Sequence, residues 1–210
     1  MGSGDVGSTG TGASTGIGTG TGSPSWWFDS GRVCLDLLAT RVKGEELLCG
    51  PSELAAWLLG ARLVPAGTPL DGMGADWVQA FRQLRALIGE VVEGGCSDAA
   101  LEPVNSLAAG PPPAPRAVRV PDGSLAYVLA SEPRCEQLLA AVARDAVGLL
   151  TDPVARAALR RCEGDNCRRL YLDTSRGRRR RWCSSEVCGN RERVARHRRR
   201  AAVAAQAYPD

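Results

Sequence analysis

Four cysteines near the C-terminal end of the sequence have the spacing of a metal site. Cys162 and Cys167 form one pair and Cys183 and Cys188 the other, with four residues inside each pair and fifteen between the pairs. Each short loop brings two thiolates to one side of an ion, and two such loops provide the tetrahedral sulfur coordination that zinc prefers. The pattern predicts one Zn2+ per chain. A disulfide pair and a redox or iron–sulfur site are the alternatives.

The other four cysteines are scattered singly among apolar residues, where a cysteine usually behaves as a small buried hydrophobic group. They are Cys34, Cys49, Cys96 and Cys135. The N-terminal residues lack the basic start and continuous apolar run of a secretory signal, so we expect a reducing compartment. In such a compartment, paired cysteines bind metal more often than they form disulfides.

Positive charge is concentrated around the paired cysteines. Residues 156–200 contain sixteen arginines and five acidic residues, a net charge of +11, whereas the rest of the chain carries −8. This asymmetry indicates a polyanionic partner, with a solvated surface as the alternative. We expect the nucleic-acid contacts to come from Arg176, Arg178, Arg179, Arg180, Arg181, Asn190, Arg191, Arg193, Arg196 and Arg200. Asn190 and Arg191 lie beside the metal loops and could support these loops instead.

The segment after Cys183 is expected to be a helix that carries much of this charge. Ser184 is its predicted N-cap, with the helix beginning at Ser185. At 100° per residue, an apolar stripe and a cationic stripe lie roughly 130° apart. The apolar stripe, predicted to face inward, consists of Val187, Val194 and Ala201. The cationic stripe consists of Arg193, Arg196 and Arg200.

Upstream, apolar residues at three- and four-residue steps predict a mainly α-helical protein with a small β-hairpin. Helices are expected within 25–42, 50–64, 74–95, 97–110, 132–150 and 152–160, a hairpin over 116–130 and a strand within 168–175. The inward faces of the two longest helices are Trp77, Phe81, Leu84, Ile88 and Val91, and Leu138, Val142, Ala146 and Leu149. The expected N-caps are Ser52, Ser97 and Asp152.

Three segments follow from these patterns. Residues 1–24 are almost wholly Gly, Ser and Thr and cannot offset the entropy of ordering, so a disordered tail is expected there. Residues 25–155 form the helical domain, and residues 156–204 form the four-cysteine zinc-finger module that ends in the basic helix.

No stretch of the sequence is apolar enough for a membrane span, and no catalytic motif is recognisable, so we expect neither a membrane protein nor an enzyme. One group could line a small-molecule pocket, although core packing is the alternative. It consists of Trp26, Trp27, Arg32 and Asp36.

The C-terminal motifs also resemble a known family. "RRWCSSEVCGNRERVARHR" resembles the CGNR zinc finger, whose name is spelled by residues 188–191, and "RRCEGDNCRRLYLDTSRGRRRRWC" resembles its first half. Upstream, "GRVCLDLLAT", "PSELAAWLLGARLV" and "LLAAVARDAVGLLTDPVARAALRRC" resemble the companion ABATE domain. The resemblance spans residues 25–200. It implies a stress-induced bacterial transcription regulator with the four paired cysteines as zinc ligands.

These observations predict a zinc-dependent DNA-binding regulator of the bacterial cytoplasm, associated with the nucleoid when bound to DNA. The helical domain would form a homodimer or bind a small-molecule effector. The alternatives are an RNA- or ribosome-associated protein and a module that binds acidic protein surfaces. Single-stranded RNA favours exposed aromatic side chains, and the basic region offers only Tyr171 and Trp182, so duplex DNA is preferred.

Overall fold

The structure, a computed structural model, describes residues 26–94, 97–165 and 167–207. The predicted disordered tail and Cys96 lie outside these ranges. In chain order the elements are α1 (Val33–Leu38), β1 (Arg41–Val42), β2 (Glu45–Glu46), α2 (Pro51–Gly60), α3 (Ala75–Glu93), α4 (Asp98–Ala109), β3 (Pro115–Arg119), β4 (Leu125–Leu129), α5 (Cys135–Thr151), α6 (Pro153–Ala158), β5 (Leu159–Arg161), β6 (Leu170–Leu172), the π-helical turn η1 (Ser185–Gly189) and α7 (Asn190–Ala207). The mainly helical fold, with small antiparallel strand pairs and a basic C-terminal helix, is confirmed.

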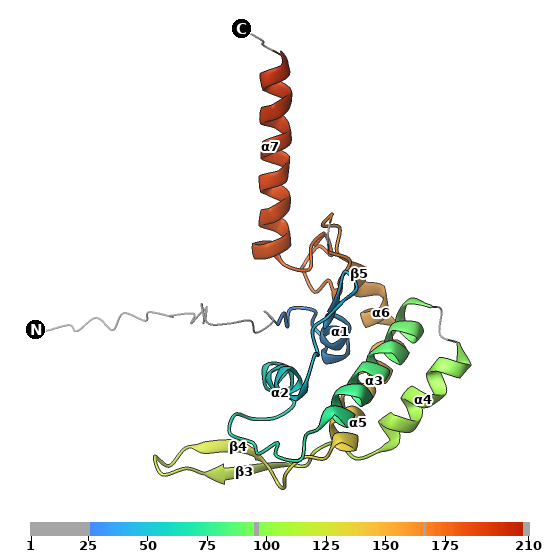
Figure 1. Ribbon diagram of the computed structural model, residues 1–210, viewed down its shortest axis with the longest axis vertical. Coiled ribbons are helices and arrows are strands. Elements are labelled where there is room, and N and C mark those ends of the chain that lie inside the picture. Colours follow the sequence, from blue (N-terminus) through green and yellow to red (C-terminus); the bar gives the residue numbers. More distant parts are fainter. Residues whose placement is uncertain (1–25, 95–96, 166, 208–210) are drawn as a thin grey trace, which may run out of the picture.

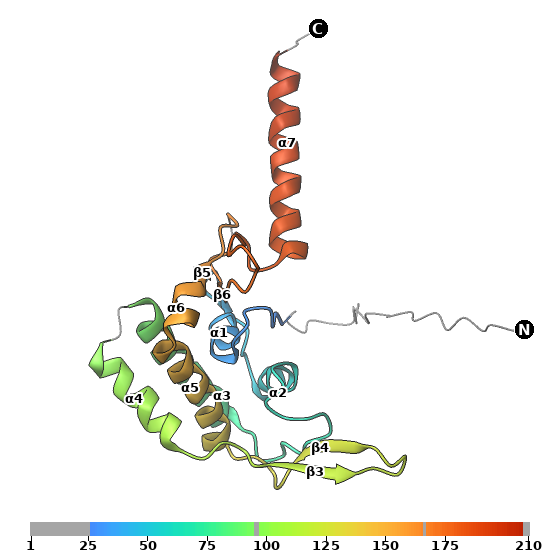
Figure 2. The ribbon, with the colours of Figure 1, turned by 180° about the vertical axis from the view of Figure 1, so that it is seen from behind.

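The helices α1 to α5 form the body of the protein, and its hydrophobic core lies between them. α3, α4 and α5 run side by side in both views, with α1 and α2 on one side of them (Figures 1 and 2). Both predicted stripes are buried: Trp77, Phe81, Leu84, Ile88 and Val91 on α3, and Leu138, Val142, Ala146 and Leu149 on α5. Burying a large apolar side chain contributes roughly 1.5–3 kcal/mol, so these stripes stabilise the body without a metal.

Of the three helix caps predicted upstream of the paired cysteines, two are confirmed. The Ser97 hydroxyl accepts a hydrogen bond from the Ala100 amide, and the Asp152 carboxylate accepts one from the Val154 amide at 2.8 Å. Ser52 was the wrong cap for α2. The N-cap of this helix is Gly50, two residues before Ser52, and Pro51 is its first helical residue. Proline lacks an N–H and has a fixed φ, which suits this first position.

The strands form three separate antiparallel pairs. The predicted hairpin is confirmed as β3 and β4, but β5 and the β1–β2 hairpin were not predicted. β1 and β2 have two residues each and are joined by Lys43 and Gly44, whose φ angles are 53° and 87°. Two-residue strands are too short to show the alternation by which a strand is recognised in a sequence.

α1 is fastened to α5 by polar contacts. The Arg32 guanidinium lies 2.9 Å from the Asp145 carboxylate, and the same carboxylate accepts the Cys34 amide at 2.9 Å. Asp36 is buried and accepts a hydrogen bond from the Ser30 amide at 3.3 Å. Arg32 and Asp36, expected at a ligand pocket, therefore make contacts within the fold.

Trp26 and Trp27, the other two residues of that expected pocket, are half-buried, and Trp26 packs against the core of the body. The indole Nε1 atoms of both residues are buried without a hydrogen-bond partner. Of the isolated cysteines that the structure describes, Cys34 and Cys135 are buried as expected, whereas Cys49 is exposed. No described helix is both long and apolar enough to cross a membrane.

Candidate metal centre

The four paired cysteines converge on one point. Their Sγ atoms all lie within 4.8 Å of one another, and the Sγ of Cys183 is 3.5 Å from that of Cys167 and 3.7 Å from that of Cys188. A tetrahedral zinc site with Zn–S distances of about 2.3 Å has sulfur–sulfur edges of about 3.8 Å. A disulfide needs a separation of about 2.05 Å. The cluster, which Cys162 completes, therefore fits a metal ion better than a disulfide.

The backbone of each cysteine loop is closed by hydrogen bonds. In the first loop the Cys167 amide donates to the Gly164 carbonyl at 2.9 Å. In the second, the Ser184 hydroxyl accepts the amides of Glu186 and Val187, each at 3.2 Å, so Ser184 is the N-cap as predicted. The turn that it caps, η1, is π-helical and places Cys188 one turn inside.

Strand β6 connects the metal centre to the body. Tyr171, at its middle, is fully buried in the cysteine cluster, whereas Leu170 and Leu172 point to the other side and pack against the core of the body. β6 lies within the segment 168–175 in which a strand was predicted. β6 pairs with β5, and the Leu172 amide donates to the Ser30 carbonyl beside α1 at 2.8 Å. The module and the body thus share one short strand.

Hydrogen bonding distributes the thiol protons unevenly. A hydrogen bond from the Cys183 thiol lowers the pKa of the Cys167 thiol to about 5. The same hydrogen bond, together with burial, raises the pKa of Cys183, and burial raises the pKa of Cys188 to about 11. Because the thiolate is the form that binds metal, the lowered pKa of Cys167 favours its role as a ligand.

One arginine of the predicted phosphate-binding run is turned inward. The Arg180 guanidinium stacks on the ring of Tyr171, 4.7 Å from its centroid. It also donates from Nε to the Trp182 carbonyl at 2.8 Å and from Nη2 to the Cys183 carbonyl. These contacts occupy the guanidinium and hold the chain that leads into the second cysteine pair.

Asp173 organises the same loop from the other end. It is 1% exposed, and its carboxylate accepts the Ser175 amide and hydroxyl at 3.0 and 2.6 Å and the Arg180 amide at 2.9 Å. The hydrogen bonds from Ser175 hold the pKa of Asp173 below its usual value. This role of Asp173 was not predicted. The signal available was its spacing from Ser175, since an aspartate often binds the backbone two residues further on.

The remaining arginines of the loop divide into two groups. Arg181 lies 2.5 Å from the Glu163 carboxylate and its guanidinium is 5.3 Å from the centroid of Trp182, so its charge is already matched. Trp182 packs against the cysteine cluster. The exposed members, for which the described contacts show no side-chain partner, are Arg176, Arg178 and Arg179.

Helix α7 stands away from the rest of the protein in both views (Figures 1 and 2). Its predicted inward stripe is wrong: Val187 is 38% and Val194 is 49% exposed, and Ala201 is exposed too. The reason is the direction of the helix, which extends beyond the body and makes its main contact with η1. No described element lies over the stripe.

Some polar side chains of α7 make contacts within the protein and others make none among the described residues. Arg193 donates from Nε to the Gly189 carbonyl and from Nη2 to the Ser185 carbonyl, each at 3.2 Å, so it closes the junction with η1. Arg191 borders a small hollow beside Cys167 and Cys188. Apart from Arg191, the exposed polar side chains of α7 with no contact among those described are Asn190, Arg196, His197, Arg198 and Arg200.

Comparison with protein families agrees with this arrangement. The ABATE model, described as "Putative stress-induced transcription regulator", matches residues 31–153, and the CGNR zinc finger model matches residues 158–201. No curated protein matches the sequence. Because the first model covers more than half of the chain, the protein belongs to the ABATE family, and it carries a CGNR zinc finger at its C-terminal end.

Proposed function

We propose that the protein is a zinc-dependent transcription regulator of the bacterial cytoplasm that binds duplex DNA through its CGNR module. The observation that carries the proposal is the position of α7. This helix leaves the four-cysteine centre, stands clear of the body (Figure 1) and carries six arginines between Arg191 and Arg200. The body, residues 25–155, would have a regulatory or oligomerising role, and residues 156–204 would form the DNA-binding module.

The four paired cysteines would hold one Zn2+. In zinc-finger peptides the metal contributes roughly 10–16 kcal/mol, enough to fold a segment that lacks an apolar core. The module has little such core, since its buried cluster consists of Cys162, Tyr171, Cys183 and Cys188. Zinc would therefore fix the direction in which α7 leaves the cluster. Arg180 and Arg193 would support the loops rather than contact DNA.

The free arginines of α7 suit the major groove. Its 18 residues give a length of roughly 27 Å, and the groove is about 12 Å wide, so the helix can lie in it. Arg196 and Arg200 are exposed on one face and would contact phosphates or base edges. Arg178 and Arg179, on the loop, would contact the backbone of the duplex.

A matched pair of substitutions tests these assignments. Arg178→Ala should lower the slope of log K against log salt by about 0.9, the value for one phosphate contact, without changing zinc content. Arg180→Ala should instead reduce zinc retention and destabilise the loop, because it removes the contacts with Tyr171, Trp182 and Cys183. DNA titrations at several salt concentrations and metal analysis of both variants provide the readouts. An unchanged slope for Arg178→Ala would place the interface elsewhere.

Genome-wide crosslinking of the zinc-loaded protein tests the function itself. Discrete peaks at promoters are the expected result, and their loss in an Arg196→Ala/Arg200→Ala variant would connect them to α7. Enrichment on RNA or ribosomes alone would contradict the proposal and favour an RNA-binding role for the same surface.

A further inference from the structure

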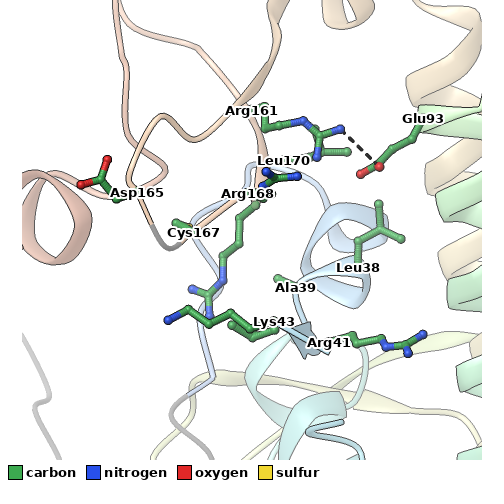
Figure 3. A pocket seen from close by; sticks show the side chains of 12 residues that line it. Leu38, Ala39, Arg41, Lys43, Glu93, Arg161, Asp165, Cys167, Arg168 and Leu170 are labelled. Carbon is green, nitrogen blue, oxygen red and sulfur yellow. Dashed lines mark ion pairs between the residues drawn. The ribbon is translucent and has the colours of Figure 1, made fainter. Parts of the chain in front are cut away.

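A cleft lies between the body and the zinc module; it borders the cysteine cluster at Cys167, and no arginine of α7 lines it. Its volume is about 410 Å3, within the range of small-molecule sites. One wall consists of the end of α1 and the β1–β2 hairpin, and the other is formed by β5 and the first cysteine loop (Figure 3). Leu38, Val42 and Leu170 contribute apolar surface to its lining.

The charges around this cleft are unbalanced. Its two carboxylates are already engaged: Glu93 lies 3.2 Å from Arg161, as Figure 3 shows, and Asp165 lies 3.9 Å from Arg199 of α7. The lining cations with no carboxylate partner among the described contacts are Arg41, Lys43, Arg168 and Arg169. Of these, Arg169 has a buried Nε without a hydrogen-bond acceptor. The cleft therefore has an excess of donors and of positive charge.

Two of these cations occupy unusual backbone positions. Only four described residues other than glycine have a positive φ, and two of the four line this cleft: Lys43 at 53° and Arg168 at 100°. Residues other than glycine rarely adopt a positive φ, and asparagine or glycine would suit the Lys43–Gly44 turn better. Strained positions of this kind concentrate at ligand sites.

The side chains of these two residues approach the opening from opposite sides. In Figure 3, Arg168 extends from the cysteine loop towards the hairpin that carries Lys43. Lys43 is also the only lysine in the sequence, among 25 arginines. An ammonium group and a guanidinium group on facing walls form a clamp for an anion with several oxygens.

We propose that this cleft binds a small phosphorylated molecule, with its phosphate between Lys43 and Arg168 and its apolar part on Leu38, Val42 and Leu170. A nucleotide has the required combination of a phosphate and a flat, weakly polar group. The cleft is a concave site of limited volume with an apolar lining, which favours a small ligand over the backbone of a duplex. Duplex phosphates are the other source of the same chemistry, and the experiment separates the two.

A ligand in the cleft would affect α7 through the first cysteine loop, which forms one wall of the cleft and contacts α7. The Asp165 amide donates to the Glu192 carboxylate of α7 at 3.2 Å, next to the ion pair with Arg199. An effect of the ligand on DNA affinity would rest on the proposed function. Binding of the ligand does not, so it is measured without DNA.

Acylation of amines tests the site directly, because the full-length zinc-loaded chain has one lysine. The probes are AMP, GMP and inorganic phosphate, with adenosine and sodium chloride at matched ionic strength as controls. At ten times Kd, a nucleotide should slow acylation of Lys43 about tenfold by mass action. The N-terminal amine, read in the same mass spectrum, should be unaffected.

Substitutions that suit the backbone keep the test independent of folding. Lys43→Asn removes the amine but favours the turn, so it should weaken AMP binding about tenfold in titration calorimetry without lowering the melting temperature. Lys43→Arg should retain binding. Arg62→Asn is the matched control, since Arg62 is an exposed cation with a φ of 57° that does not line the cleft.

Three results would overturn the proposal. One is equal acylation of Lys43 in AMP, phosphate and chloride. Another is unchanged AMP binding by Lys43→Asn. The third is protection by a short DNA duplex but by none of the small phosphates, which would assign these cations to the DNA path.

Discussion

The body and the zinc module of this protein are stabilised in different ways. The body buries apolar side chains from five helices, and among its largest fully buried residues are Trp57, Phe81 and Leu138. The module has one fully buried aromatic residue, Tyr171, among its cysteines, and surrounds this cluster with arginines. Apolar burial can fold the first region, whereas the second has a small core and strong charge repulsion, which the proposed metal ion would offset.

The two regions nevertheless share a strand. Tyr171 belongs to the cysteine cluster, while Leu170 and Leu172 on either side of it belong to the core of the body. This alternation makes β6 the place where unfolding of one region would reach the other. Whether the chain unfolds in one step or in two therefore depends on β6.

Removing one ligand should have the largest effect. Cys167→Ser should abolish zinc binding and unfold residues 160–200, because the roughly 10–16 kcal/mol contributed by the metal is lost. Metal analysis and the loss of NMR dispersion in these residues are the measurements. The cooperative melting of the helical body should persist. Cys49→Ser is the matched control, since Cys49 is exposed and far from the cluster in the sequence, and it should keep one zinc per chain.

A substitution in the core of the body should have a smaller effect on stability than the loss of a metal ligand has on the module. Leu138 is fully buried in α5, so Leu138→Ala should lower the free energy of unfolding of the body by about 2–5 kcal/mol. Leu125→Ala, at a residue that is 66% exposed on β4, should change it by less than about 0.5 kcal/mol. Denaturant titration gives both values, with zinc content measured in parallel.

Zinc retention in the Leu138→Ala variant shows whether the body and the module unfold as one cooperative unit or as two. We expect the variant to keep its zinc at denaturant concentrations that unfold the body. Release of zinc at the same midpoint would show that β6 transmits unfolding and that the two regions form one cooperative unit.

Much of both regions follows from the sequence, for physical reasons that differ. On α3 and α5 the three- and four-residue spacing fixes which side chains face the core, and on the metal loops the cysteine spacing fixes which sulfurs can meet. Ser97, Asp152 and Ser184 cap helices as predicted because this interaction is local. Ser52 fails because Pro51 is a better start of the helix.

Properties that depend on distant residues could not be predicted in this way. The helical period correctly groups Val187 with Val194, but only the direction of α7 determines that nothing described covers them. Likewise, a run of arginines gives no indication that Arg180 stacks on Tyr171 while Arg178 is exposed. The cleft beside Lys43 is made by elements far apart in the chain, including β5, which pairs with β6 across the first cysteine loop.

The last prediction concerns pH, because the stability of the body and the zinc content of the module should depend on it in opposite ways. Burial raises the pKa of Asp36 to about 6, so its carboxylate is more readily ionised in the unfolded chain than in the folded body. The nearby charges of Asp145 and Asp29 act in the same direction, and the hydrogen bond from Ser30 opposes them. As the pH rises from about 4 through 6, this group should therefore cost the body up to about 3 kcal/mol, after which the loss levels off.

Asp36→Asn should remove this slope and stabilise the body at pH 7, because the amide oxygen can still accept the Ser30 amide without carrying a charge. Asp71→Asn, at an exposed position, controls for the loss of one negative charge. The module should respond to acid in the opposite direction, since metal binding requires thiolates that acid protonates. Melting curves and zinc content measured from pH 7 to pH 5 should thus diverge in the wild type, with the body gaining stability while the module loses metal. Parallel changes in both, or an unaltered slope in Asp36→Asn, would mean that the two regions do not titrate separately.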